Sequence, residues 1–136
     1  MAATISRSDV LQPSINFLDT VTAGATVSVS GCSGGNSVYT TVTLKIVARY
    51  YDANGTHISG ADKSKVLGVR SGSGTGSAYA AYQEANYNAG LWTAGNRPSG
   101  AVKAKYHYQS HVGASSPCPA SVNDTADGPD SDWVVW

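Results

Sequence analysis

The sequence feature that most constrains the fold is a strict alternation of apolar and polar residues between Tyr39 and Tyr51. Because successive side chains of a β-strand point to opposite faces, a period of two over this length predicts a strand with one buried face. We expect the buried face to carry Val42, Leu44, Ile46, Ala48 and Tyr50. The opposite face would then carry Thr43, Lys45, Arg49 and Tyr51.

Further strands are expected along most of the chain, separated by turn residues. Residues 21–30 alternate in the same way, with the apolar side chains Val21, Ala23, Ala25, Val27 and Val29 on one face. A strand is also predicted at 10–17, where Pro13 favours an edge position because it cannot donate a ladder hydrogen bond. Asn54-Gly55 is a favoured reversal dipeptide. Short strands are predicted at 56–59 and 65–70, and a long one at 100–112. In the long strand, Lys103, Lys105 and His107 point to one face, and Ala104, Tyr106 and Tyr108 point to the other.

Two segments of the middle chain are harder to interpret. The run Ser71-Gly72-Ser73-Gly74-Thr75-Gly76 is typical of a mobile connection between strands. Residues 77–88 fit a helix, with Ser77 as N-cap and Gly90 near the C-cap, but they also fit a strand with alternating tyrosines. We favour the strand because the rest of the chain is β-like.

Length and composition limit the fold class. A chain of 136 residues has room for one ordinary domain. With 15 Gly, one Glu and one Met, the chain is poor in helix formers other than Ala. Seven or eight short strands predict an all-β, single-domain antiparallel β-sandwich, with a small barrel as the alternative. We expect residues 1–9 to be a flexible N-terminal arm and residues 10–136 to form the domain.

The charge balance excludes a nucleic-acid partner, and the lengths of the apolar runs exclude a membrane helix. Lys plus Arg is 9 and Asp plus Glu is 9, so the formal net charge is zero, and only 13% of residues are charged. A nucleic-acid binder needs a basic surplus to release counterions, so we expect no nucleic-acid partner. No apolar run approaches the roughly 20 residues of a membrane helix, so we expect no transmembrane segment.

The two cysteines indicate an exported protein. Cys32 and Cys118 lie 86 positions apart, each among turn-forming residues, so they cannot form a local redox or zinc motif. We expect them to form one disulfide, the bond typical of oxidising compartments. The start of the chain has no basic stretch and no apolar core of a signal peptide. We therefore expect this sequence to be the mature form of a secreted, extracellular protein.

Candidate chemistry is sparse, and the sequence predicts a protein that is not an enzyme and needs no cofactor. Glu84 is the only Glu, and no nucleophile motif has the expected context. Asp127, Asp130 and Asp132 are a weak calcium candidate, because the acidic order of an EF-hand is absent and a solvated acidic loop explains them as well. His107 and His111 would lie about 13 Å apart on a strand, too far for one metal.

Aromatic residues and one arginine are the candidate partner-binding residues. Tyr and Trp supply rigid amphipathic contact area, although buried tyrosines with hydroxyls at the edge of the core explain the pattern equally well. The candidates are Arg7, Tyr79, Tyr82, Trp92, Trp133 and Trp136. Arg7 would enter a protease-like groove of a partner from the polar arm. The apolar segment Trp133-Val134-Val135-Trp136 is expected to pair as a closing strand or to dock on a partner, because four exposed apolar residues are costly.

Part of the chain resembles a known family. The segments Ser77-Ala78-Tyr79-Ala80-Ala81-Tyr82, Ala89-Gly90-Leu91-Trp92 and Lys103-Ala104-Lys105-Tyr106-His107-Tyr108 look like the small secreted bacteriocins typified by lactococcin 972. The resemblance covers about residues 77–108. It implies a β-sandwich that acts at the bacterial cell envelope. Residues 2–70 and the cysteine pair depart from the pattern, so no functional residue is carried over.

Three functions fit these observations. The first is a secreted, non-enzymatic binding protein that acts through protein–protein interaction, as an adaptor or accessory subunit of a bacterial toxin or antagonism assembly. The second is a lectin-like glycan-binding module that uses Trp92 and neighbouring tyrosines as stacking platforms. The third is a secreted protease inhibitor. In each case the partner is a macromolecule, most often a protein, or else a glycan or another component of the cell envelope.

Overall fold

A computed structural model describes residues 3–13, 19–117 and 121–136. These residues form eight antiparallel strands and one short helix, which confirms the all-β, antiparallel prediction. The elements are β1 (Thr4–Arg7), β2 (Thr20–Ser28), β3 (Ser37–Tyr51), β4 (Lys63–Thr75), β5 (Ser77–Ala85), α1 (Ala89–Gly95), β6 (Lys103–Ser115), β7 (Val122–Asp127) and β8 (Val134–Val135).

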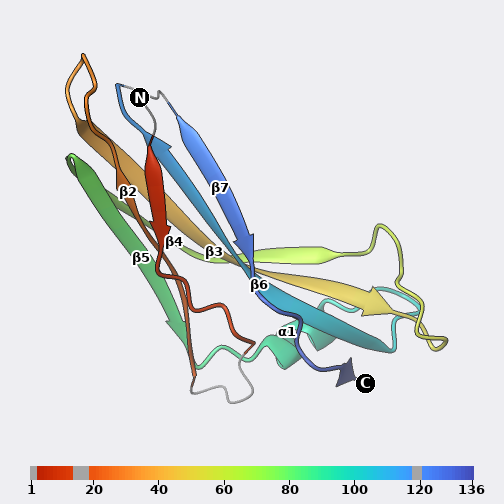
Figure 1. Cartoon of the computed structure of the whole chain (residues 1–136). Coiled ribbons are helices and arrows are strands. Elements are labelled where there is room, and N and C mark those ends of the chain that lie inside the picture. The colour runs from red at the N-terminus through yellow and green to blue at the C-terminus, as the bar shows by residue number, and fades with distance from the viewer. Residues whose placement is uncertain (1–2, 14–18, 118–120) are drawn as a thin grey trace.

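The strands form two sheets that lie face to face (Figure 1). One sheet has three strands in the order β1-β2-β5. The other has five strands: β4-β3-β6-β7 lie side by side, and β8 pairs with the first two residues of β6, Lys103 and Ala104. Helix α1 lies at one end of the two sheets, near the C-terminus (Figure 1). The long strands β3 and β6 therefore form the centre of the larger sheet.

The alternating face of β3 is the centre of the core, as predicted. Its apolar side chains Val42, Leu44, Ile46, Ala48 and Tyr50 are all fully buried. They pack with inward side chains of β2, β5 and β6, such as Val27, Ala80 and Tyr108. The predicted apolar face of residues 21–30, most of which belong to β2, is buried as well: Val21, Ala23, Ala25, Val27 and Val29. Two sheets with matched apolar faces explain why this chain folds as a single layered unit.

The Gly/Ser run corrects one prediction. Residues 71–75 are not a mobile connection but continue β4, which is far longer than the predicted strand 65–70. No Cβ would fit at Gly72 or Gly74, because the backbone of β5 lies against them. Gly76, with φ +80°, then turns the chain directly into β5. Small residues therefore let two strands of different sheets come into contact. The strand that we favoured for residues 77–88 is confirmed over Ser77–Ala85.

The N-terminal predictions are only partly right. Residues 4–7 are not a flexible arm, because they pair along their whole length with β2 as β1. In the predicted strand 10–17, Val10 forms an isolated bridge with Thr22 and the described residues 11–13 form no strand. Residues 14–17 of that prediction lie outside the described residues. Strand pairing thus begins earlier in the chain than its composition indicates.

The C-terminal half contains two elements that the sequence pattern does not predict. The first is β7, which lies in the acidic segment 122–132 and pairs with β6. Helix α1 begins after Asn88, whose side-chain oxygen accepts a hydrogen bond from the Leu91 amide at 3.0 Å. The predicted closing strand at the C-terminus is confirmed, because β8 pairs with β6 and Trp136 stacks on the buried Tyr50 at 5.9 Å. No helix of the described residues has the length and apolar character to cross a membrane.

The predicted disulfide stays a prediction, because Cys118 lies outside the described residues. Cys32 is half-buried in the turn between β2 and β3 and packs against the core cluster around Val27. Gly34 in the same turn lies against Pro117, the residue before Cys118. The structure therefore places Pro117, the last described residue before Cys118, beside the turn that carries Cys32.

Candidate functional site

The outer face of the five-stranded sheet carries an unusual group of side chains at the end near α1. Strands β3 and β6 run antiparallel there, and their register pairs Arg49 with Lys105 and Tyr51 with Lys103. All four side chains alternate with core residues, so they point away from the other sheet. Because β8 pairs with Lys103 and Ala104, it brings Trp133 to the same place. We call Arg49, Tyr51, Lys103, Lys105 and Trp133 the Trp133 face.

The charges of the Trp133 face are not balanced. Arg49 and Lys105 are directly opposed across two strands, an arrangement of like charges that destabilises a sheet. Within the described part of the chain, no ion pair includes Arg49, Lys103 or Lys105. The Arg49 Nε is buried and has no hydrogen-bond partner among the described residues. A buried charged donor without a partner is costly, so this arrangement calls for an explanation.

Trp133 gives the face an aromatic centre. The Nζ atoms of Lys103 and Lys105 lie 4.1 and 4.6 Å from the centroid of its ring. Tyr51 meets the same ring edge-on, with centroids 4.8 Å apart. The residue is nevertheless 42% exposed. Cation–π contacts offset part of the repulsion between the cations and hold the indole in place while leaving it accessible.

Acidic groups lie beside the face rather than on it. His107 is the next outward residue of β6, and its ring nitrogens lie 3.5 Å from an Asp127 oxygen and 3.7 Å from an Asp130 oxygen. Gln109 donates a hydrogen bond to Asp127 at 2.8 Å. The two aspartates therefore border the sheet on the β7 side. The outer face changes from cationic around Arg49 to acidic along β7.

Among the predicted partner-binding residues, Trp133 is the one that lies on this face. Trp92 and Trp136 pack against the buried cluster around Tyr50. Tyr82 packs against the core beside Gly68, beneath the Arg70 guanidinium, and donates a hydrogen bond to Glu84. That hydrogen bond raises the pKa of Tyr82. Tyr79 is 60% exposed but lies on β5, in the other sheet. The predicted set therefore does not form one site.

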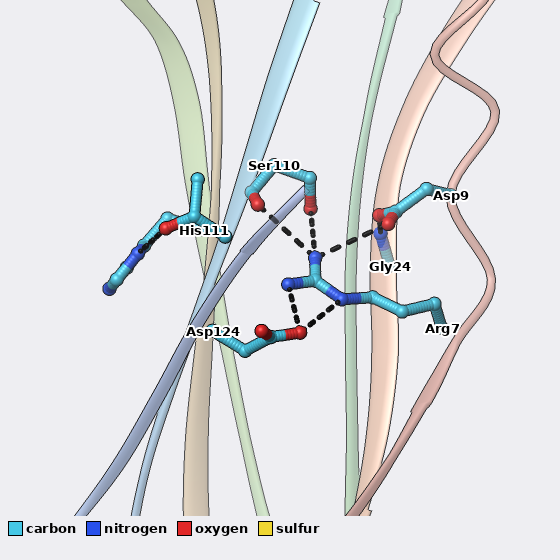
Figure 2. A network of polar contacts seen from close by, with 7 residues as sticks. Arg7, Asp9, Gly24, Ser110, His111 and Asp124 are labelled. Atoms are coloured by element: carbon cyan, nitrogen blue, oxygen red, sulfur yellow. Dashed lines mark hydrogen bonds and ion pairs between the residues drawn. The ribbon is translucent and has the colours of Figure 1, made fainter. Parts of the chain in front are cut away.

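Arg7 has a different role from the predicted one. Figure 2 shows its guanidinium reaching from β1 across to β6 and β7. It donates to Asp124 at 2.8 and 3.2 Å, to Asp9 at 3.2 Å and to Ser110 Oγ at 3.0 Å. Asp9 also accepts a hydrogen bond from the Gly24 amide at 2.9 Å. We call this network the Arg7 clasp. It ties the two sheets together, so Arg7 is not free to enter a partner's groove while these contacts hold.

The acidic tail does not form the calcium site that the sequence allowed. No three His, Cys, Asp or Glu residues in the described ranges lie close enough together to hold a metal ion. Asp127 and Asp130 flank His107 instead. His111 bonds through Nδ1 to Thr125 Oγ1 at 2.9 Å and is held apart from His107.

The sequence pattern identified the side chains of the Trp133 face but did not predict that they lie next to one another. The alternation placed Lys45, Arg49 and Tyr51 together on the outer face of one strand, and Lys103, Lys105 and His107 together on one face of another. It could not supply the register that sets Arg49 against Lys105, because pairing between distant strands is not written in either segment alone.

Comparisons with protein-family models, with curated proteins and with solved structures find no match to this chain. The function is therefore argued from the geometry described above.

Proposed function

We propose that the chain is a secreted, non-enzymatic binding module whose Trp133 face holds an acidic surface of a protein partner. The observation that carries this proposal is the opposition of Arg49 and Lys105, together with the buried Arg49 Nε that has no partner among the described residues. Sequences usually avoid such a like-charge pair, and exceptions concentrate at functional sites.

A partner carboxylate would relieve the opposition of the two cations. Placed between them, it would accept charge-assisted hydrogen bonds from the Arg49 guanidinium and the Lys105 ammonium. It would also neutralise the charge of a guanidinium whose buried Nε has no partner among the described residues. The neighbouring Trp133 ring would exclude water from these contacts and strengthen them.

The composition of the face favours a protein partner. Trp, Tyr and Arg are the residue types that contribute most to protein–protein binding energy, and the face contains one of each. An accessible indole surrounded by cations fits an apolar side chain flanked by carboxylates. Secretion is supported by the approach of Pro117, the residue before Cys118, to the turn that carries Cys32, because it favours the disulfide typical of oxidising compartments.

The test is a titration of the folded protein with a hexaglutamate peptide, followed by the NMR signals of the Trp133 indole and of the backbone at residues 49–51 and 103–105. We expect saturable shifts at these positions with hexaglutamate and none with hexalysine. The double variant Arg49→Gln/Lys105→Gln should lose at least tenfold in affinity. Lys45→Gln, which changes a cation on the same face opposite Gln109, is the matched control.

A stability measurement separates a binding role from a structural one. If the cation pair serves binding, Lys105→Gln should weaken peptide binding while leaving the free energy of unfolding equal or higher by about 0.5 kcal/mol, because a repulsion is removed. A marked loss of stability in Lys105→Gln, with unchanged peptide affinity, would contradict the proposal.

A second candidate function, glycan binding, is favoured by a shallow pocket at the opposite end of the same sheet. Its volume is about 550 Å³, and it is lined by Tyr39, Ser73, Ser115 and neighbouring residues without a charged side chain. Tyr39 is 51% exposed and donates a hydrogen bond to Ser71 at 3.0 Å, which holds the ring in place. A ring beside hydroxyl groups suits a neutral sugar. Binding on a glycan array that Tyr39→Ala abolishes and Trp133→Ala spares would favour this function instead.

A further inference from the structure

The outer edge of β4 is a second surface that the Trp133 face does not use. β4 is the last strand on its side of the five-stranded sheet. Its second half is covered, because Gly72 and Gly74 lie against the backbone of β5. Its first half, Lys63–Arg70, pairs with β3 alone among the described strands. Unpaired amides and carbonyls along such an edge are a template for a further strand.

At this edge a side chain, rather than a neighbouring strand, satisfies one backbone acceptor. The Arg70 guanidinium donates a hydrogen bond to the carbonyl of Val69, its own neighbour, at 2.9 Å. The same guanidinium lies 5.0 Å from the ring centroid of Tyr82. The side chain therefore occupies the position next to a backbone group that a partner strand would otherwise satisfy.

The side chains of this half-strand are sorted by face. Val66 and Val69 are opposite the outward residues Lys45 and Thr43, and they are 51% and 44% exposed. Lys65 and Arg70 are opposite the inward residues Ile46 and Val42 and lie over the rings of Tyr87 and Tyr82. In the described part of the chain, Lys63, Lys65 and Arg70 form no ion pair.

We propose that the Lys63–Arg70 edge of β4 binds an extended acidic segment of a protein partner as an added antiparallel strand. The main-chain hydrogen bonds would supply affinity, as in other cases of strand addition. Alternate side chains would supply selectivity, because acidic residues on one face of the segment would meet Lys65 and Arg70. Apolar residues on its other face would cover Val66 and Val69.

A second copy of this chain is a poorer occupant of the same edge. In the antiparallel self-pairing that sets Val66 against Val69 of the other copy, Lys65 would face Arg70. Like charges directly opposed destabilise a sheet, and the irregularity of β4 next to Leu44 and Lys45 further weakens pairing between identical edges. Edge lysines protect proteins from such self-association, and the same lysines select an acidic strand.

This inference does not rest on the Trp133 face, and the two sites can fail separately. The probe is an acetylated, amidated octapeptide that alternates Glu with Val and Thr, and its matched control carries Lys in place of each Glu. We expect the acidic peptide to shift the backbone amide signals of residues 63–70 and to slow their hydrogen exchange. Signals of residues 49–51 and 103–105 report the Trp133 face, so binding at β4 is scored from residues 63–70 alone.

Variants of the edge complete the test. Lys65→Gln/Arg70→Gln should lower the affinity for the acidic peptide at least tenfold with an unchanged thermal midpoint. Arg97→Gln is the control. Arg97 lies over Trp136, far from β4 in the sequence, so this variant should bind the peptide as the parent protein does. Equal binding of the Lys peptide, unchanged affinity in the double variant, or no binding at all would overturn the proposal. Concentration-dependent self-association that protects the β4 amides would identify a second copy as the occupant instead.

Discussion

The two outer edges of the five-stranded sheet are treated differently by this sequence. The β7 edge carries Asp124 and Asp127 and is tied to the other sheet by the Arg7 clasp. The β4 edge carries three cations without ion pairs among the described residues, and its first half has no strand beyond it. A net charge of zero therefore conceals a separation of charge between the two sides of one sheet.

Two arginines make the contrast concrete. The Arg7 guanidinium bonds to two carboxylates and a hydroxyl, and its side chain is 20% exposed. The Arg70 guanidinium has an aromatic ring and the carbonyl of its own neighbour as partners. An arginine therefore closes the β7 edge, whereas the arginine at the β4 edge leaves that edge available to a partner. We expect the first edge to contribute to stability and the second to binding.

The largest effect is expected at the β7 side, from the predicted disulfide. Cys118 precedes β7 and Cys32 precedes β3, so a bond between them would anchor the loop that leads into the acidic edge. In the chain-entropy account, closing so long a loop stabilises by about 4–5 kcal/mol. Non-reducing peptide mapping should recover the linked pair, and Cys32→Ser/Cys118→Ser should lose stability of that order. Free thiols in the folded, air-exposed protein would refute the bond.

The strand between the two edges should be nearly as sensitive. Leu44→Ala removes a fully buried side chain of β3 and should lower the free energy of unfolding by about 3 kcal/mol through lost burial and a residual cavity. Lys45→Ala, the adjacent outward residue, should change it by less than about 0.5 kcal/mol. Urea unfolding of both variants checks the pair. Similar losses in the two variants would mean that the register of β3 is wrong.

The clearest test of the comparison exchanges each arginine for alanine. Arg7→Ala should cost about 2 kcal/mol, because it leaves the half-buried Asp9 without its cation and removes hydrogen bonds to charged groups. Arg70→Ala should cost less than about 0.5 kcal/mol, since it removes contacts at an exposed edge. Hydrogen exchange should accelerate at β1 and β7 in the first variant alone. Equal costs for the two would remove the distinction between a closed and an open edge.

The sequence predicted the strands whose pattern is local and missed those that depend on distant partners. Alternation in β2 and β3 gave the buried faces correctly, and in β6 it separated the two faces, because a period of two is a property of each strand alone. Residues 71–75 and β7 have the composition of loops, because Gly, Ser and Asp are common in turns. They are strands because β3 and β6 supply the pairing and because small side chains permit close approach of β5.

The same reason limits prediction of the functional residues. Arg7 and Asp124 are 117 positions apart, and nothing near either residue indicates the other. Arg49 was predicted on the outward face of its strand and Lys105 on the same face as Lys103 and His107, but only the register opposes Arg49 and Lys105. The exposure of Trp133 and the partial burial of Trp136 follow from the two-residue strand β8, which is too short for periodicity to orient.

The smallest expected effect concerns the tyrosine beneath the β4 edge. The Tyr87 hydroxyl is buried without a partner among the described residues, and burial, aided by the negative charge of Glu84, raises its pKa to about 12. Because an unfolded tyrosine ionises near pH 10, the neutral group in the folded state costs stability only as pH rises from about 10 through 12. Tyr87→Phe should therefore have a free energy of unfolding in urea at pH 8 equal to or slightly above that of the parent protein, since it loses an unpaired hydroxyl.

The advantage of Tyr87→Phe should grow between pH 10 and 12. Other tyrosines with raised pKa values, Tyr50 and Tyr106 among them, keep part of the alkaline loss of stability in both proteins. A difference between the two proteins that stays constant over this range would show that Tyr87 titrates like an exposed tyrosine, and that solvent reaches the interior from the open side of the sheet.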